Sequence, residues 1–298
     1  MTISPYAMPR SPQAFPSLSL RHLDLLWVQV AGTRCNLECV HCFVSAGPDN
    51  GRHGLMSRDD VRRVVGEGLA LGVREIYFTG GEPFLQPEMV GVLGDTLAWA
   101  PCTVLTNGTL FTRSRLEALR RVSEASRYSL EIRVSLDGDV AEAHDALRGV
   151  GTFARTLAGL VEFERHGLLP IVTVIQADGE SPRATAARYV AMLRRSGIER
   201  PRLKLLPLLR LGRESLRSRG YDAGETLAGL PASALDPSTL QCASCRAVSS
   251  LGVFACPLLV DEPGGRIAER LAAGLGSVEL RHGACHACHV TGMTCANG

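Results

Sequence analysis

Short apolar runs of strand length recur along this chain, and segments with helical periodicity separate them. The runs are mostly rich in branched residues and predict strands at 25–30, 75–78, 102–105, 130–135, 171–175 and 202–206. Ser57 precedes two acidic residues and predicts a capped helix, and Thr112 predicts a second one that runs to about Ser123. Pro182 stands where a third helix can begin. The chain is therefore expected to alternate between strands and helices.

This alternation is typical of a parallel sheet in the α/β class. Six units are too few for a closed eight-stranded barrel, so we expect a partial (β/α)6 barrel of the TIM type, with its chemistry at the carboxyl ends of the strands. The stretch 212–237 is rich in Gly, Ser, Arg and Pro and precedes a small cysteine-rich C-terminal domain. We expect an N-terminal arm at 1–24, the barrel at 25–211 and the cysteine-rich domain at 212–298.

The composition is that of an ordinary globular protein, with 45% hydrophobic and 21% charged residues among 298. Basic residues number 32 and acidic residues 30, so the net charge of +2 gives no reason to expect nucleic acid or an anionic membrane as a partner. The N-terminus lacks the pattern of a secretory signal, and we expect a cytoplasmic protein. Ten cysteines in such a protein favour metal ligation over disulfides.

Three of these cysteines form the spacing C-x3-C-x2-C at Cys35, Cys39 and Cys42, on the loop after the first predicted strand. Three thiolates can bind three irons of a 4Fe-4S cluster and leave the fourth iron open. An open coordination position distinguishes a reactive metal site from a closed structural one. The alternative interpretation is a zinc knuckle.

A second motif, Gly80-Gly81-Glu82-Pro83, directly follows the second predicted strand. Two glycines let the main chain approach a ligand, and a carboxylate can accept hydrogen bonds from an ammonium group. In this order the two motifs resemble those of the radical S-adenosylmethionine (SAM) superfamily. The resemblance implies a cluster whose open iron binds SAM, reductive cleavage to a 5'-deoxyadenosyl radical, and a Gly-Gly-Glu-Pro loop that binds the SAM amino group. We also expect a low-potential electron donor such as flavodoxin or ferredoxin.

The resemblance extends to residues at the ends of later strands. The SAM-binding set that we predict from it is Gly80, Gly81, Glu82, Pro83, Asn107, Ser135, Arg148 and Gln176. Acidic residues available by position to receive a polycationic substrate at the barrel mouth are Glu131, Asp137, Asp178 and Glu180. Solvated loop positions explain these acids equally well, and Asp137 also belongs to an Asp-Gly turn pair.

Six further cysteines form two groups in the C-terminal region: Cys242, Cys245 and Cys256, then Cys285, Cys288 and Cys295. Paired C-x2-C elements are a strong metal signal. They resemble the SPASM and shorter twitch domains of radical SAM enzymes, which implies auxiliary 4Fe-4S clusters, although the run after Cys288 is shorter than in the full SPASM pattern. Six thiolates cannot fully ligate two clusters, so we expect one auxiliary cluster held by four of the six. A structural zinc site is the alternative.

Two tail thiols would then be left over. A free tail cysteine that returns a hydrogen atom to a substrate radical would make the protein an epimerase, whereas electron transfer to the auxiliary cluster would make it a dehydrogenase. We favour the epimerase slightly, with an unidentified hydrogen donor among the six tail cysteines. Cys102, in contrast, is expected to be an inert buried thiol.

The expected substrate is a small polar molecule, such as a sugar or an aminoglycoside, because the 24 residues before the first strand cannot hold a leader-peptide domain. By size and cluster layout the chain resembles two enzymes that act on aminoglycosides, neomycin C epimerase and the deoxy-scyllo-inosamine dehydrogenase of butirosin biosynthesis. A peptide-modifying maturase is an alternative. A non-catalytic iron-sulfur electron-transfer protein is an alternative of a different class, but such a protein does not need a SAM amine site.

Overall fold

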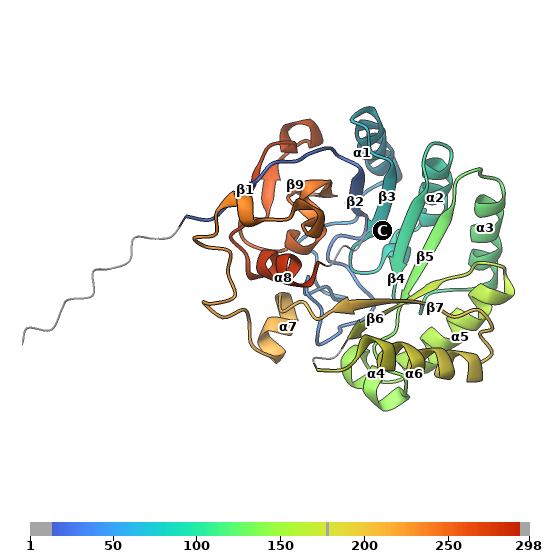
Figure 1. The fold of residues 1–298 in the computed structure, drawn as a ribbon. Coiled ribbons are helices and arrows are strands. Elements are labelled where there is room, and N and C mark those ends of the chain that lie inside the picture. The colour runs from blue at the N-terminus through green and yellow to red at the C-terminus, as the bar shows by residue number, and fades with distance from the viewer. Residues whose placement is uncertain (1–13, 177–178, 293–298) are drawn as a thin grey trace, which may run out of the picture.

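The computed structural model describes residues 14–176 and 179–292 (Figure 1). Its strands are β1 (Ser17–Leu18), β2 (Leu25–Gln29), β3 (Glu75–Thr79), β4 (Cys102–Thr106), β5 (Leu130–Ser135), β6 (Ile171–Gln176), β7 (Arg202–Pro207), β8 (Cys245–Ser249), β9 (Gly252–Phe254), β10 (Arg266–Ala268) and β11 (Val278–Glu279). Its α-helices are α1 (Arg58–Ala70), α2 (Met89–Leu97), α3 (Arg113–Glu124), α4 (Ala141–Arg148), α5 (Thr152–Arg165), α6 (Pro182–Arg195), α7 (Gly212–Arg217) and α8 (Gly283–Thr291). None of the helices described is long and apolar enough to cross a membrane.

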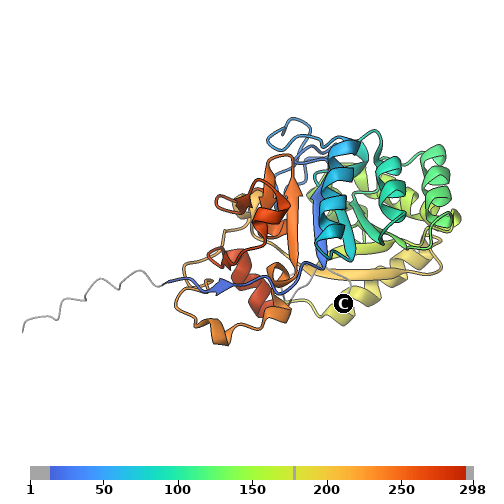
Figure 2. The ribbon, with the colours of Figure 1, turned by 90° about the horizontal axis from the view of Figure 1, so that it is seen from above.

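Nine strands form one sheet in the order β10-β9-β8-β2-β3-β4-β5-β6-β7. The strands β2 to β7 are parallel, which confirms the six predicted strands and the α/β class. The sheet keeps two edges, β10 and β7, so the barrel is partial. Helices α1, α2, α3, α5 and α6 follow the outside of the curved sheet (Figures 1 and 2).

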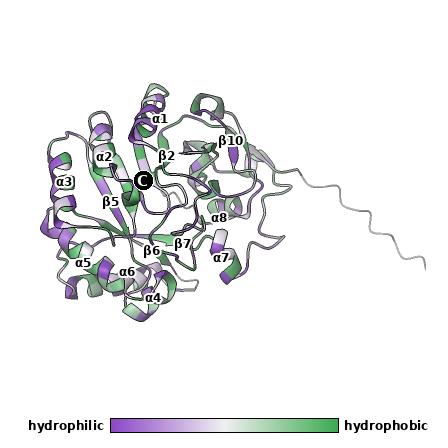
Figure 3. Cartoon of the chain, turned by 180° about the vertical axis from the view of Figure 1, so that it is seen from behind, coloured by the Kyte–Doolittle hydropathy of each residue, from purple (hydrophilic) through white to green (hydrophobic). Residues whose placement is uncertain are grey.

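Alternate residues of the parallel strands contribute to two different cores, as the period of two along a strand requires. On β2 and β3, Leu26 and Phe78 face the helices and belong to an outer core. Trp27 and Tyr77 face the opposite side, where they form an inner core with the C-terminal region, and their rings stack with centroids 4.3 Å apart. The covering helices are amphipathic, and Figure 3 shows hydrophilic positions along α1 and α3.

The helix starts predicted from capping residues are confirmed. The Oγ of Ser57 accepts a hydrogen bond from a main-chain N–H of the first turn of α1 at 3.1 Å, and Thr112 does the same for α3 at 3.3 Å. Pro182 is the first residue of α6. Side-chain caps satisfy N–H groups that have no partner within the helix, and proline is tolerated at this position for the same reason.

Strands β8 to β10 of the C-terminal region extend the barrel sheet. β8 pairs in parallel with β2, with Cys245 opposite Leu25, and continues into the antiparallel strands β9 and β10. The short strand β1 of the N-terminal arm pairs with β11. A seventh parallel strand therefore lies beside the six that the sequence predicts, on the side of β2 (Figure 2). The division of the chain at residue 212 stays a prediction.

Candidate active site

A cavity of about 1300 Å³, including its open mouth, lies at the carboxyl ends of the parallel strands. Its walls come from the loop after β2, the ends of β3 to β7 and a short segment after β9, and we call it the barrel cavity. The predicted site residues that line it are Cys35, Cys39, Cys42, Gly80, Gly81, Asn107, Ser135, Asp137 and Arg148. Motifs that are far apart in the sequence thus converge where the fold places the chemistry of parallel barrels.

Each of the three cysteines on the β2 loop has an N–H donor close to its sulfur. Cys35 Sγ and Cys42 Sγ accept hydrogen bonds from main-chain N–H groups two and four positions later, at 3.4 Å and 3.3 Å. Cys39 Sγ lies 3.9 Å from Nη1 of Arg148, which donates to it. Donors of this kind stabilise the negative charge on thiolate ligands and contribute to the reduction potential of iron-sulfur clusters.

Cys35 and Cys39 are buried and Cys42 is half-buried, and burial raises the pKa of Cys35 to about 12. Burial also raises the pKa of Cys39, although the charge of Arg148 opposes it. A coordinated metal deprotonates such thiols outright. No group of three His, Cys, Asp or Glu side chains in the described ranges could hold a single metal ion. The shared cavity, the three thiols and their N–H donors fit a cluster of several irons.

Gly80 and Gly81 bring the end of β3 against the cysteine loop. Gly81 N donates to Gly32 O at 2.8 Å, and a Cβ atom on Gly81 would lie 2.0 Å from the carbonyl oxygen of Arg34. Gly80 has a φ of 135°, which L side chains rarely adopt. Glycine is therefore required at both positions. Because glycine has no side chain, the loop presents main-chain atoms to the barrel cavity, as a contact with the SAM amino group would need.

The side chain of Glu82 is fully buried and is not part of the cavity lining. Its carboxylate accepts hydrogen bonds from Phe84 N at 3.1 Å, Thr106 Oγ1 at 2.7 Å and Asn107 N at 2.8 Å. Burial raises the pKa of Glu82, and these three donors oppose the rise. The carboxylate therefore joins the ends of β3 and β4. Its contact with the SAM ammonium group stays a prediction, and the exposed part of this motif is the glycine main chain.

Asp137 is the centre of a buried polar cluster. Its Oδ2 accepts hydrogen bonds from His41 Nε2 at 2.9 Å and Arg148 Nε at 2.6 Å, and its Oδ1 accepts one from Ile175 N at 3.1 Å. Burial favours the neutral acid, but Arg148 and His41 outweigh burial and hold the pKa of Asp137 well below its usual range. The cluster joins the cysteine loop, the end of β5, α4 and β6. Protein donors thus engage both carboxylate oxygens, and the substrate contact of Asp137 stays a prediction.

Of the other residues predicted to bind SAM, some line the barrel cavity and others do not. Asn107 and Ser135 line the barrel cavity, and Nδ2 of Asn107 lies 3.8 Å from Cys35 Sγ. Gln176 does not line it, and its Nε2 donates to the main-chain carbonyl of Glu180 in the following loop at 2.6 Å. Pro83 begins a buried 3-10 turn and also lies outside the lining.

The other acidic residues predicted to receive a substrate lie elsewhere. Glu131 accepts a hydrogen bond from Arg133 Nε at 2.8 Å on β5 and is not part of the cavity lining. Glu180 forms an ion pair with Arg188 of α6, also outside the lining. Asp178 lies outside the described residues. These positions therefore give no support to a cluster of acids at the barrel mouth.

Two residues that the sequence did not single out support the cysteine loop. His41 stands between the second and third cysteines and binds Asp137, and its place in the motif was the available signal. Arg213 on α7 donates to Cys39 O at 2.8 Å and to Ser45 O at 3.2 Å, and it also binds Ala46 O. Arg213 lies 174 residues from Cys39 in the sequence, so no local pattern could reveal this contact.

The lining of the barrel cavity is mostly apolar. Its larger hydrophobic side chains are Trp27, Leu37, Phe43, Val44, Leu105, Val174, Ile175, Leu206, Leu209 and Leu258. Among the described lining residues, Asp137 is the only Asp or Glu and Arg148 the only Lys or Arg, and these two form an ion pair. A ligand in this cavity therefore meets no uncommitted carboxylate from the part of the chain that the structure describes.

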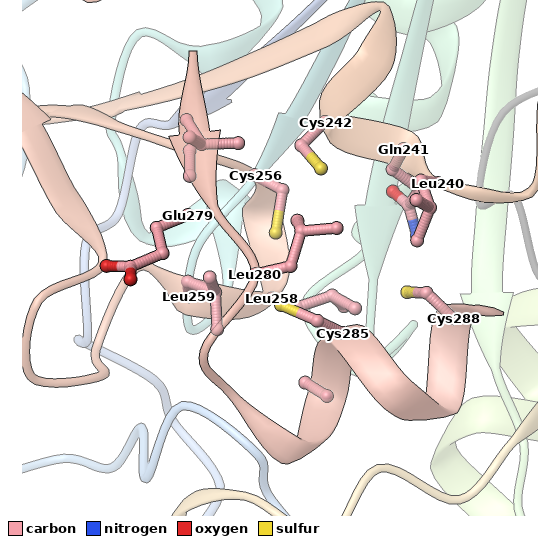
Figure 4. A pocket seen from close by; sticks show the side chains of 13 residues that line it. Leu240, Gln241, Cys242, Cys256, Leu258, Leu259, Glu279, Leu280, Cys285 and Cys288 are labelled. Carbon is pink, nitrogen blue, oxygen red and sulfur yellow. The ribbon is translucent and has the colours of Figure 1, made fainter. Parts of the chain in front are cut away.

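Four tail cysteines line a second cavity, of about 390 Å³ including its opening, which we call the tail cavity. They are Cys242, Cys256, Cys285 and Cys288, and Figure 4 shows their side chains around a shared space. Burial raises the pKa of Cys242 to about 12 and also raises that of Cys256 well above its usual value. The first two come from turns next to β8 and β9, and the other two from α8.

The remaining cysteines differ. Cys245 is fully buried on β8 and lines neither cavity, and Cys295 lies outside the described residues. None of the five tail cysteines in the described ranges lines the barrel cavity. Cys102 is buried in the outer core, where the sequence predicted an inert thiol.

The two cavities are neighbours. Leu258, two positions after Cys256, contributes to the lining of both, and Pro257 also lines the barrel cavity. Leu258 is therefore part of the wall between the two cavities. A group held by the tail cysteines would therefore lie on the other side of Leu258 from the barrel cavity.

Comparison with known families identifies the chain. The sequence profile of the radical SAM superfamily matches residues 30–178, which are half of the chain and contain the cysteine loop, the glycine loop and Asp137. The chain belongs to the radical SAM superfamily. Membership implies a 4Fe-4S cluster and SAM as cofactors.

Relatives share the barrel but differ in function. AdoMet-dependent heme synthase of Methanosarcina barkeri is 35% identical over 138 residues, 46% of this chain and 37% of the relative. The subtilosin biosynthesis protein AlbA of Bacillus subtilis is 31% identical over 137 residues, 45% of this chain and 29% of the relative. The chain thus matches only about a third of either relative's length. The crystal structure of Streptococcus suis SuiB matches with a TM-score of 0.57 and 14% identity, over 84% of this chain and 64% of SuiB, and this likeness shows the fold alone.

Proposed function

We propose that this radical SAM enzyme holds its 4Fe-4S cluster on Cys35, Cys39 and Cys42 and binds SAM against the main chain of Gly80 and Gly81. The observation that carries the proposal is the convergence of these five residues on the barrel cavity. When bound and reduced, such a cluster supplies the electron that cleaves SAM to the 5'-deoxyadenosyl radical, which removes a hydrogen atom from a substrate.

The polar residues around the cysteine loop hold it in place. Asn107 and Arg148 place N–H groups near two of the sulfurs. Glu82 fixes the main chain of Asn107, and Asp137 fixes Arg148. Arg213 binds three carbonyl groups of the loop from the side of α7. We assign these residues positioning roles, because each acts through a cysteine or through its loop.

We further propose that Cys242, Cys256, Cys285 and Cys288 hold the auxiliary 4Fe-4S cluster. Full ligation of one cluster needs four thiolates, and these four line one buried, apolar cavity. The amide nitrogen of Gln241 in the same cavity has no partner among the described residues, and a bound cluster would offer it an acceptor.

This ligand set predicts that the two cysteines of one C-x2-C element, Cys242 and Cys245, differ in their effect on iron content. Replacement of Cys242 by Ala should reduce the iron content from about eight to about four irons per chain, because the auxiliary cluster loses a ligand. Replacement of Cys245 by Ala, three positions away, should keep about eight irons. Iron and zinc analysis after anaerobic purification measures both. Loss of iron in the Cys245 variant would contradict the ligand set, and one zinc in place of the auxiliary irons would assign the tail a structural role.

The same placement bears on the fate of the substrate radical. An epimerase needs a thiol that reaches the substrate. The proposed ligand set leaves Cys245, which lines neither cavity, and Cys295, which lies outside the described residues. The dehydrogenase alternative needs an electron acceptor near the substrate, which an auxiliary cluster supplies. The shared wall at Leu258 supports a short separation. We therefore now favour net oxidation of the substrate, by loss of a hydrogen atom, an electron and a proton, over epimerisation.

The cavity lining also changes the expected substrate class. A polycationic aminoglycoside is best bound by several carboxylates, and the described lining offers only Asp137, which is paired. Apolar side chains from β2, β4 and β7 and from the tail suit a substrate with a neutral, hydrophobic reacting part. We propose such a substrate in place of an aminoglycoside.

Substrate class can be tested through uncoupled SAM cleavage. With the reconstituted, reduced enzyme, we expect neomycin to leave the rate of 5'-deoxyadenosine formation at its basal value. Neutral hydrophobic compounds, such as N-acetyl-leucine amide, should change the rate in a saturable way, because they can occupy the apolar part of the cavity. Saturable stimulation by neomycin, with hydrogen transfer from it into 5'-deoxyadenosine, would return the substrate to the aminoglycoside class.

A further inference from the structure

The tail cavity contains a polar side chain that the ligand assignment does not use. Gln241 is 7% exposed and precedes Cys242 on a short 3-10 turn, and it lines the cavity together with the four cysteines. Its Nε2 has no hydrogen-bond partner among the described residues. Leaving a buried donor unsatisfied destabilises a protein, so such a group needs a partner in the working molecule.

The side chain is aimed at the space between the cysteines. In Figure 4 the amide nitrogen of Gln241 points toward Cys288 and the interior of the cavity. The other side chains that line the cavity are mostly apolar, among them Leu240, Leu258 and Leu280, and these side chains cannot accept a hydrogen bond. Glu279, the one carboxylate in the lining, is an exposed residue, and its oxygens point away from the cysteines.

We propose that Gln241 donates a hydrogen bond to a sulfur of the auxiliary cluster and thereby raises its reduction potential. The inference rests on the proposed function, because it requires a cluster on the four tail cysteines. Reduction adds one negative charge to a cluster. An N–H donor stabilises the reduced form more than the oxidised form, so removing the donor makes reduction harder. Gln241 would thus set how readily the cluster accepts an electron.

The test is a redox titration of the auxiliary cluster in the reconstituted full-length chain, followed by electron paramagnetic resonance. Gln241→Leu keeps the approximate volume of the side chain and removes the donor. We expect the ratio of reduced to oxidised auxiliary cluster at a fixed potential to fall about tenfold, which is a shift of about 59 mV to more negative potential for one electron. Iron content and the potential of the cluster on Cys35, Cys39 and Cys42 should not change.

A matched control separates redox tuning from a general loss of buried hydrogen bonding. Gln86 is also buried, and its Nε2 donates to Met56 O at 3.3 Å, outside the tail cavity. Gln86→Leu should lower the melting temperature without changing the auxiliary potential. An unchanged potential in Gln241→Leu with full iron content would overturn the inference and leave the auxiliary cluster intact. Absence of any auxiliary cluster signal in the wild-type protein would instead refute the proposed ligand set.

Discussion

The variant with Cys35, Cys39 and Cys42 all replaced by Ala is expected to keep its fold but to contain about four irons in place of about eight. The three cysteines lie on a loop, in a small hydrophobic cluster separate from the outer and inner cores of the barrel. Their removal should therefore leave the packing of the sheet intact. Iron analysis and circular dichroism of the reconstituted protein measure the two effects.

Cys102→Ala is the control for this experiment. Cys102 is buried in the outer core, so its replacement removes a thiol without removing an expected ligand. This variant should retain all of its iron. Full iron content in the triple variant, or iron loss on replacing Cys102, would contradict the assignment of the β2 loop as a cluster site.

Asp137→Ala is expected to destabilise the protein strongly, by about 3–5 kcal/mol in the free energy of unfolding. The side chain of Asp137 is 1% exposed and accepts hydrogen bonds from Arg148, His41 and Ile175 N. Its removal leaves the guanidinium of Arg148, a side chain that is only 13% exposed, without its counter-charge. Urea denaturation at neutral pH gives the change. Asp137→Asn keeps the shape of the side chain and should cost less, and equal stability of the Ala variant and the wild type would refute this role.

The same cluster predicts a dependence of stability on pH. Because the folded pKa of Asp137 lies below its unfolded value of about 3.9, the ionised carboxylate contributes its full stability above that value, and the contribution declines as the pH falls further. Burial lowers the pKa of His144 to about 4 in the folded protein. Because the unfolded chain already binds a proton at this histidine below about pH 6.5, the free energy of unfolding also declines as the pH falls from about 6.5 to about 4. Wild-type unfolding measured from pH 7 to pH 3 should show both declines, and Asp137→Asn only the one at higher pH.

Local signals in the sequence predicted the elements of the barrel and the two loops of the candidate site. Strand positions follow from branched apolar runs, and the starts of α1 and α3 follow from Ser57 and Thr112, because a capping oxygen acts on N–H groups within the next turn. The cysteine and glycine motifs are equally local, since each brings its ligand groups together within one loop.

The remaining features of the candidate site depend on tertiary contacts, which local sequence patterns do not reveal. The element Cys242-x2-Cys245 looks like one ligand pair, yet Cys242 faces the tail cavity while Cys245 lies on β8 opposite Leu25. Which thiols converge depends on how β8 joins the sheet, and the sequence did not predict that pairing. Glu82 likewise has a carboxylate suited to an ammonium group, but two of its three donors come from the end of β4. Such partners become visible only once the strands are in place.

The measurement that tests the central claim most directly is the formation of 5'-deoxyadenosine by the wild-type protein after anaerobic reconstitution and reduction with dithionite in the presence of SAM. We predict 5'-deoxyadenosine and methionine in equal amounts from the wild type and from Cys102→Ala, and neither product from the triple variant that lacks Cys35, Cys39 and Cys42. A wild-type protein with full iron content that yields no 5'-deoxyadenosine, or a triple variant that yields as much as the wild type, would contradict the account.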